Sequence, residues 1–247
     1  MTEIHYGLKL WSHNTNLIDD ATYLIRTDTF QFIELTIIPD TDISPFLDRE
    51  IPFMIHLTPD HYGVNIADCR IREFNHRIIH QCREWADQLN ARYIILHPGF
   101  GRLECAIHLL GEYNDPRIII ENMPKQDISG ERLVGYSPDQ MKDLCQGKFG
   151  SCLDLNHAIK AAITLKKDFH EYIEEFMLLE PAMFHISDGS FHHQVDEHLN
   201  FGEGDYPLPF LMSCLKGQKI RYVTLETPRH SHSLHDDVKN LKVLQGM

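Results

Sequence analysis

YIILH (residues 93–97) and RIIIE (residues 117–121) are short apolar runs that end in a metal-binding type of side chain, and stretches of this kind decide the fold. Continuous runs of four to eight apolar residues are typical of parallel strands that are buried on both faces. The predicted strands are His5–Leu10, Phe30–Thr36, Phe53–Leu57, Tyr93–His97, Arg117–Glu121, Cys152–Leu155, Met183–Ile186 and Arg221–Glu226.

Helical patterns lie between these strands. The clearest is Ile71–Leu89, in which apolar residues recur at helical spacing and form one stripe. Ser137 and Pro138 are a plausible N-cap and first-turn pair for another helix. The segment Pro39–Arg49, after the second strand, is too abbreviated for a long helix. The other predicted helices are Leu17–Ile25, Ser137–Cys145, Phe169–Leu179, Leu208–Leu215 and Ser233–Leu244.

The alternation of strand and helix, repeated along 247 residues, predicts a single-domain (β/α)8 barrel over residues 1–247. A doubly wound parallel sheet is the alternative. The chain has the length of one such barrel and is too short for a barrel plus a second sizeable domain.

Composition restricts the class of protein. The formal net charge of −13 argues against an extended DNA-binding surface, although bound metal ions would add positive charge that this count omits. No apolar run is long enough to span a membrane, and the first residues, MTEIHYGLKLW, lack the layout of a secretory signal. Six cysteines without CxxC spacing fit reduced core thiols better than disulfides. We therefore expect a cytoplasmic protein.

Polar side chains end six successive predicted strands. They are His56, His97, Glu121, Asp154, His185 and Glu226. A lone histidine at a strand end is more often structural than ligating, and a lone glutamate can pair with lysine or arginine. In a β/α barrel, however, the carboxyl ends of all strands meet at the active-site face, where carboxylates are costly to bury unless they are paired or bind metal. Six such residues together predict a metal site.

Two short motifs add further ligands. Asp154 and His157 flank the point where the chain leaves the sixth strand, and Asp196 and His198 have the spacing that points two side chains of an extended loop the same way. Imidazole and carboxylate ligands without thiolates suit Zn²⁺, Mn²⁺ or Fe²⁺.

The same stretches resemble the xylose isomerase-like barrel superfamily, and within it the endonuclease IV branch (apurinic/apyrimidinic endonuclease family 2). They are IHLTPDHYGVN, LHPG, IIIENMP, CLDLNHA, FHISDG, VDEHLNFGEGDY and VTLETP. The resemblance implies up to three divalent metal ions, most simply Zn²⁺, that clamp a phosphodiester and generate a hydroxide nucleophile. It implies catalytic roles for Glu121 and Glu226.

The resemblance also implies how the ligands are shared among the three ions. His56 and His97 would bind the first ion, which Glu121 would bridge to the second. The second ion would also take Asp154, His185 and Glu226. The third would be held by His157, Asp196 and His198.

Candidate substrate-binding residues are Tyr62, Asn65, Glu34 and Arg102. Tyr62 and Asn65 follow His56 at a wider spacing than the family shows, so His61 competes with His56 for the first ligand. Glu34 is more typical of the sugar isomerases, but it could instead pair with Lys9. Arg102 could contact a phosphate or simply cap the next helix.

Other histidines are expected to be solvent-exposed rather than ligating. They are His192, His193, His230, His232 and His235.

Two enzymatic functions fit these residues. The first is a phosphoester hydrolase that acts on a small phosphorylated substrate or on abasic DNA. The second is a sugar isomerase or epimerase that holds one metal through Glu121, Asp154, His185 and Glu226 and exchanges a proton between carboxylates. The short acidic loop IIPDTDISPF (residues 37–46) favours the second, and the full ligand set favours the first. A sugar-binding barrel without catalytic activity is a third interpretation, which the intact ligand set disfavours.

Overall fold

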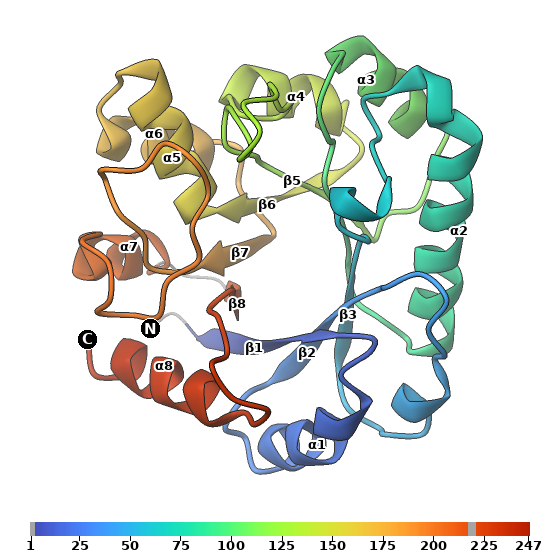
Figure 1. The fold of residues 1–247 in the computed structure, drawn as a ribbon, viewed down its shortest axis with the longest axis vertical. Helices are drawn as coiled ribbons and strands as arrows, with labels where there is room; N and C mark the ends of the chain where they lie inside the picture. Colours follow the sequence, from blue (N-terminus) through green and yellow to red (C-terminus); the bar gives the residue numbers. More distant parts are fainter. Residues whose placement is uncertain (1–2, 217–220) are drawn as a thin grey trace.

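Eight parallel strands close into a barrel in the computed structural model, which describes residues 3–216 and 221–247 (Figure 1). The strands are β1 (Ile4–Trp11), β2 (Phe32–Thr36), β3 (Phe53–His56), β4 (Ile94–Leu96), β5 (Ile118–Glu121), β6 (Gly150–Asp154), β7 (Met183–Ile186) and β8 (Arg221–Leu225). Each strand pairs with its neighbour in the chain, and β8 pairs with β1. The predicted (β/α)8 barrel is confirmed, and the doubly wound alternative is wrong.

A ring of helices surrounds the barrel (Figure 1). They are α1 (Ile18–Arg26), α2 (Arg72–Gln88), α3 (Leu103–Gly111), α4 (Pro138–Cys145), α5 (Leu155–Leu165), α6 (Phe169–Met177), α7 (Leu208–Cys214) and α8 (His235–Gln245). Between β2 and β3 the chain forms only the 3-10 turn Ser44–Phe46, as the abbreviated sequence there predicts. The Ser137 side chain accepts a hydrogen bond from the backbone N–H of Gln140 and caps α4 as predicted.

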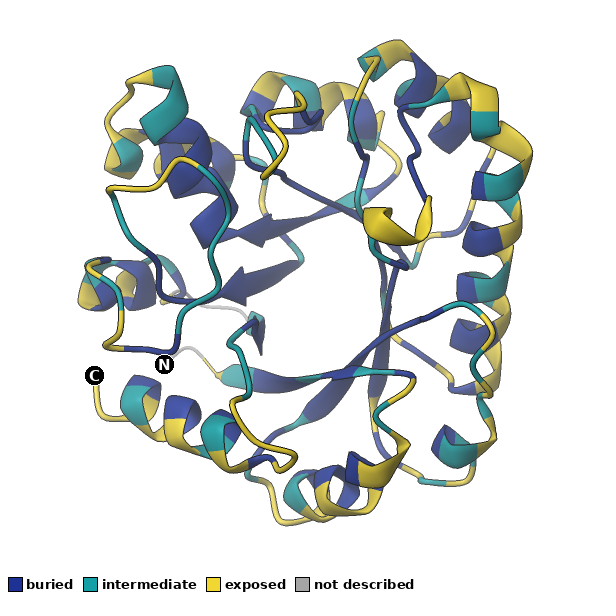
Figure 2. Cartoon of the chain, in the orientation of Figure 1, coloured by how far each residue is buried: buried dark blue, intermediate teal, exposed yellow. Residues whose placement is uncertain are grey.

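Burial follows the expected layering: β2, β3, β4, β5 and β7 are buried along their whole length, β1, β6 and β8 are buried in part, and the helices are exposed on their outer faces (Figure 2). Two helices, α3 and α5, were not predicted. In α5 every residue from Leu155 to Ala162 is buried, including the polar residues Asn156, His157 and Lys160, so this stretch has no solvent-facing side. None of the helices in the described part of the chain is long and apolar enough to cross a membrane.

The barrel interior contains two layers of inward-facing side chains. The apolar layer consists of Phe32, Met54, Ile95, Ile119, Cys152 and Met183. Two residues further along each of the same strands lies the polar layer, which consists of Glu34, His56, His97, Glu121, Asp154 and His185. Strand side chains alternate between faces, so residues two apart point into the same interior. Gly7 on β1 leaves room for the Phe32 ring, because a Cβ there would lie 2.2 Å from it.

The expectation that all cysteines are reduced is wrong for one pair. Cys69, in the segment after β3, forms a disulfide with Cys105 in α3, with the two Cα atoms 5.4 Å apart. These residues are 36 positions apart in sequence, and only the folding of adjacent barrel segments brings them together. The four other cysteines are free.

Candidate metal centre

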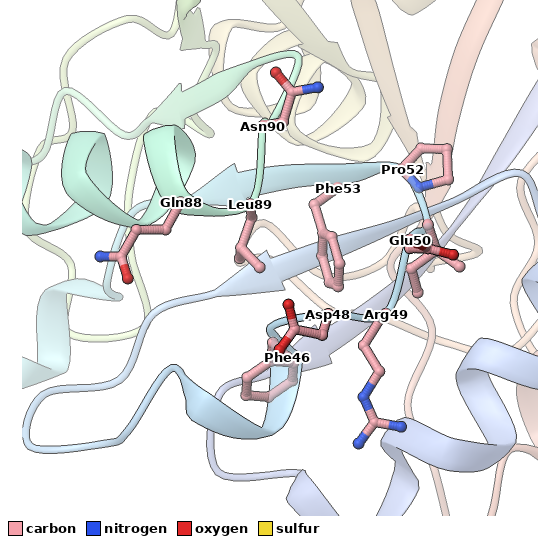
Figure 3. A pocket seen from close by; sticks show the side chains of 10 residues that line it. Phe46, Asp48, Arg49, Glu50, Pro52, Phe53, Gln88, Leu89 and Asn90 are labelled. Atoms are coloured by element: carbon pink, nitrogen blue, oxygen red, sulfur yellow. The ribbon is translucent and has the colours of Figure 1, made fainter.

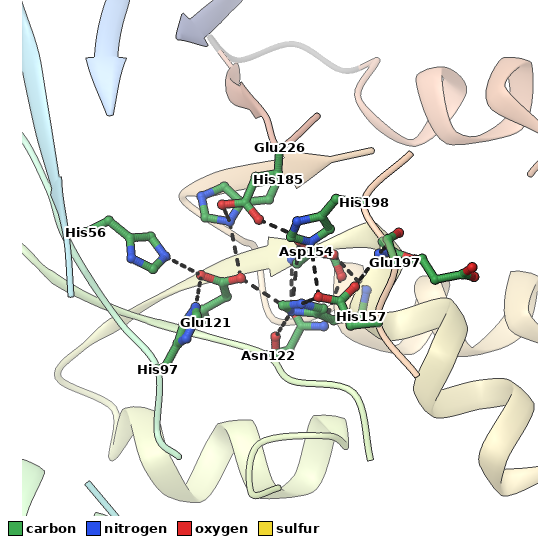
Figure 4. Close-up of polar contacts among 12 residues, drawn as sticks. His56, His97, Glu121, Asn122, Asp154, His157, His185, Glu197, His198 and Glu226 are labelled. Atoms are coloured by element: carbon green, nitrogen blue, oxygen red, sulfur yellow. Dashed lines mark hydrogen bonds and ion pairs between the residues drawn. The ribbon is translucent and has the colours of Figure 1, made fainter. Parts of the chain in front are cut away.

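The polar layer converges on Glu121 at the centre of the barrel mouth (Figure 4). Glu121 Oε2 lies 3.2 Å from His56 Nε2 and 3.0 Å from His97 Nε2. Its other oxygen, Oε1, lies 3.2 Å from His185 Nδ1 and 3.4 Å from His157 Nδ1. Glu121 therefore faces ligand groups on both sides, as a carboxylate that bridges two metal ions must.

Five groups of possible ligand atoms lie within 4.8 Å of one another among the described residues, and three of these groups consist only of the predicted ligands. The three groups are His56/His97/Glu121, then Glu121/Asp154/His185/Glu226, then Asp154/His157/His198. Asp196 joins the third group, since its Oδ2 lies 3.4 Å from His157 Nε2 and 3.2 Å from His198 Nε2. The structure thus brings all nine candidate ligands together in one cluster.

Several buried atoms of this cluster have no hydrogen-bond partner among the described residues. They are Glu121 Oε1, Asp154 Oδ2, His185 Nδ1 and His198 Nε2. Buried polar atoms are nearly always satisfied, so each such atom needs an explanation. Carboxylate oxygens and imidazole nitrogens facing one another are the donors that divalent cations bind. The side chains of the cluster do not satisfy one another's hydrogen-bonding capacity, and their donor atoms are of the kind that bind divalent metal ions.

The start of α5 fixes two of the candidate ligands. Asp154 is the N-cap of α5, and its Oδ1 accepts a 2.7 Å hydrogen bond from the His157 backbone N–H. His157 Nδ1 donates to the Asn122 carbonyl at 2.8 Å, which leaves Nε2 turned towards Asp196. The Asn122 side chain in turn bonds both backbone groups of Asp154. Asn122 was not predicted as a residue of the site. The one feature of the sequence that points to it is its position directly after Glu121.

The long segment between β7 and α7 brings Asp196 and His198 to the site. Lys160 of α5, which is fully buried, donates to the carbonyls of Ser190 and His193 and to Glu197. Asn156 Nδ2 also donates to Asp196 Oδ1 at 2.6 Å. These anchors could not be predicted from the sequence, because a lysine among apolar helix residues forms no spacing pattern.

The pKa values in the cluster reflect how closely its charged groups are packed. Burial raises the pKa of Asp154 to about 6, with Glu226 and Glu121 adding to the shift. Burial alone would lower the pKa of His198, but Asp196 raises it to about 9. Metal ions would replace such protons.

Lys9 is a residue of the site that sequence reasoning treated only as a possible partner of Glu34. Its ammonium group forms ion pairs with both Glu34 and Glu226. Burial opposes its charge, yet Glu226 and Glu34 raise the pKa of Lys9 above its usual value. Lys9 therefore stays charged, and its ammonium group is engaged by these two carboxylates.

The four candidate substrate residues are placed differently. Glu34 is fully buried and pairs with Lys9. Asn65 is also buried, and its side chain bonds backbone groups of Phe100 and Ala67. Tyr62 and Arg102 are exposed, and Arg102 is the N-cap of α3 without a side-chain capping bond.

Geometry separates His56 from His61. His56 is buried against Glu121, whereas His61 is exposed and its ring stacks at 6.2 Å on that of Trp11. His192 and His193 are exposed, and His230 contacts the amide of Asn200.

Two adjoining pockets open above the cluster and share His97, Asp196, His198 and Glu226 in their walls. The Trp11 pocket, of about 480 Å³, is also lined by Lys9, Trp11, Thr36, His61 and Arg229. The Met123 pocket, of about 500 Å³, has an apolar wall formed by Phe100, Met123, Pro124, Ile128 and Leu133.

A third cavity, of about 470 Å³, lies beside the start of β3 and the end of α2, away from the cluster (Figure 3). Its polar lining includes Asp48, Arg49 and Glu50. Its described lining contains no histidine or cysteine and does not resemble a metal site.

Comparison with known proteins identifies the family of the chain. A family model described as a xylose isomerase-like TIM barrel matches residues 42–246. The probable endonuclease 4 of Mycoplasmopsis synoviae (strain 53) is 23% identical over 228 residues, which cover 83% of this chain and 81% of that protein.

Solved structures show the same fold. A D-tagatose 3-epimerase-like protein gives a TM-score of 0.72 at 20% identity and covers 98% of this chain and 96% of its own. Endonuclease IV from Thermus thermophilus gives a TM-score of 0.71 at 19% identity and covers 98% of each chain. The likeness establishes the fold but does not choose between these two reactions.

Proposed function

The chain belongs to the xylose isomerase-like TIM barrel family, and on that premise we propose that it is a divalent-metal-dependent phosphoester hydrolase of the endonuclease IV type. The observation that carries this proposal is the third ligand group. His157, Asp196 and His198 lie together beside the other two groups. In a one-metal isomerase His157 would bind substrate, but Asp196, His198, His56 and His97 would have no metal to hold.

Zn²⁺ ions held by the three groups would polarise a phosphoryl group, lower the pKa of a bound water and neutralise the leaving oxygen. The protein's own residues have separate tasks. Glu121 holds the first two groups together, since its two oxygens face opposite sets of histidines. Glu226 lies on the pocket wall and is held in its charged form, because Lys9 lowers its pKa to about 2 against the effect of burial.

The substrate that fits best is small. Lys9 and Arg229, the lysine and arginine that line the two pockets, are each paired with carboxylates: Lys9 with Glu34 and Glu226, and Arg229 with Asp237. Neither is free to neutralise a row of DNA phosphates, which strong DNA binding requires. We propose one phosphoester group above the metal ions, with an apolar substituent against Met123. Abasic DNA is the larger substrate to be tested beside it.

The alternative function is a sugar isomerase or epimerase with a single metal ion. One specific observation favours it: Glu121, Asp154, His185 and Glu226 form a complete four-ligand group by themselves. Glu121 and Glu226 would then exchange the proton beside a metal-polarised carbonyl.

Metal stoichiometry separates the two functions. Elemental analysis of protein purified without chelator should give about three ions per chain for the hydrolase, the number that its three ligand groups can hold. The loss of one ion and of activity towards aryl phosphoesters in His198→Ala, with no change in the matched exposed variant His192→Ala, would support the proposal. A single ion in the wild type, together with an unchanged His198→Ala variant, would move the assignment to the isomerase.

A further inference from the structure

We propose that Glu34 is a positioning residue that, together with Lys9, holds His185 in the tautomer whose Nδ1 is free to bind metal. The inference rests on the metal centre of the proposed function but not on the reaction performed there. It assigns a task to two charged residues that the nine candidate ligands leave unexplained.

His185 has one nitrogen facing Glu34 and one facing the cluster. Its Nε2 lies 2.9 Å from Glu34 Oε2, and both side chains are fully buried. A carboxylate oxygen can only accept here, so Nε2 must carry the hydrogen. The Nδ1 atom faces the cluster, where it lies 3.2 Å from Glu121 Oε1 and 3.3 Å from Glu226 Oε1. These oxygens are acceptors as well, so a metal ion bound by Nδ1 would take the place of a hydrogen there, while Nε2 keeps its own hydrogen for Glu34. A histidine whose far nitrogen donates to a carboxylate is the usual arrangement behind a metal ligand.

Both oxygens of Glu34 are needed as acceptors. Oε2 also accepts from the Thr224 hydroxyl at 2.6 Å, and Oε1 accepts from the Lys9 ammonium group. Lys9 carries only donors, so whichever atom faces it must be an acceptor. Lys9 therefore determines how any side chain at position 34 is oriented.

This arrangement makes a specific forecast for Glu34→Gln. The amide has one oxygen and one NH₂ group, and Lys9 repels the NH₂ group. The oxygen must therefore face Lys9, and the NH₂ group must face His185. His185 Nε2 would then become an acceptor, and the hydrogen would move to Nδ1, where it blocks the metal.

The double variant Lys9→Met/Glu34→Gln tests the role of Lys9 separately. Without the ammonium group, the amide can turn its oxygen back to His185 and Thr224. The original tautomer should return, although the negative charge at position 34 is still absent. A purely structural role for Glu34 would give no such rescue.

The experiment uses zinc and the full-length protein. Zinc affinity is measured by competition with a chromophoric chelator, and the tautomer of His185 is read from long-range ¹H–¹⁵N correlations, assigned by comparison with His185→Asn. We expect Glu34→Gln to weaken the tightest zinc site by about 10–100-fold and to move the hydrogen to Nδ1. We expect the double variant to recover at least half of that loss on a logarithmic scale. Thr224→Val, the matched control, removes a donor to the same oxygen and should change the affinity by less than threefold.

The outcomes are distinguishable. Wild-type protein that coordinates zinc through His185 Nε2, or a Glu34→Gln variant with unchanged affinity and tautomer, would overturn the inference alone. If Glu34→Gln does not fold, the wild-type tautomer and the double variant still decide the question. Zinc binding with the expected tautomer but without phosphoester hydrolysis would overturn the proposed function alone. Wild-type protein that takes up no zinc would overturn both.

Discussion

The apolar layer and the polar layer occupy the same barrel, on the same strands, only two residues apart. In the apolar layer, Met54, Ile95 and Ile119 fill the interior and contact one another. In the polar layer, His56, His97 and Glu121 meet at hydrogen-bond distance and leave buried atoms unsatisfied. The first layer is packed among its own side chains, whereas the second leaves buried polar atoms unsatisfied among the described residues, as a site that binds metal would.

The difference shows how a barrel supports a charged site. Close packing below fixes the strands, so the side chains above cannot move apart to relieve their mutual repulsion. Glu121 and Asp154 are fully buried, which is costly for carboxylates that lack sufficient partners. The apolar layer therefore provides the rigidity that the polar layer needs to remain prepared for metal.

The largest expected effect comes from breaking the polar layer at its centre. Glu121→Gln removes the charge that faces four histidines and should lower metal affinity by at least about a hundredfold and abolish hydrolysis. Elemental analysis and an aryl phosphoester assay measure this, with the exposed Glu174→Gln as control. Full metal content in Glu121→Gln would show that Glu121 does not bridge two ions.

A substitution in the apolar layer should lower the stability of the fold and leave the metal content unchanged. Ile119→Ala leaves a cavity below Glu121 and should reduce the free energy of unfolding by about 2–5 kcal/mol, while the folded protein keeps its metal content. Urea unfolding and elemental analysis of the same sample test this. A proportionate loss of metal from folded protein would mean that the two layers are not independent.

Removal of bound metal should lower the stability of the fold without any change of residue in either layer. Ions that bind only the folded state add about 3–4 kcal/mol when present at a hundred to a thousand times their dissociation constant. Dialysis against a chelator should lower the melting temperature, and zinc should restore it. No change in melting temperature would argue against a metal centre at this face.

The smallest effect is expected at the amino end of β5, where Asp115 pairs with Arg83 and Arg117. Hydrogen bonds from Arg117 lower the pKa of Asp115, although burial opposes the shift. Such a group stabilises the fold above its unfolded pKa of about 3.9 and loses that contribution as the pH falls. Asp115→Asn should therefore cost about 1–2 kcal/mol at pH 7 and progressively less below pH 4. An equal cost at pH 7 and pH 3 would contradict this origin.

The barrel could be predicted from sequence, and so could the nine residues that the structure brings together. Six of the nine end strands that change from apolar to polar at their carboxyl ends, and His157, Asp196 and His198 belong to two short motifs. Other features could not. Lys160 and Asn156 position Asp196 through contacts 30 to 41 residues away, and no local pattern encodes such contacts. The disulfide between Cys69 and Cys105 could not be predicted for the same reason. The pairing of Lys9 with Glu34 could be predicted, but its second partner, Glu226, could not, because that residue lies 217 positions away.

The pairing of Lys9 with Glu226 joins residues 217 positions apart, on the first and last strands of the chain. During synthesis, β1 leaves the ribosome long before β8 exists, and until then Lys9 lacks one of its two carboxylates. A truncated chain that stops before β8 lacks Glu226, and with it the closure of the barrel. If the cluster binds metal as proposed, a chain that stops before β8 would lack one ligand of the second group, Glu226.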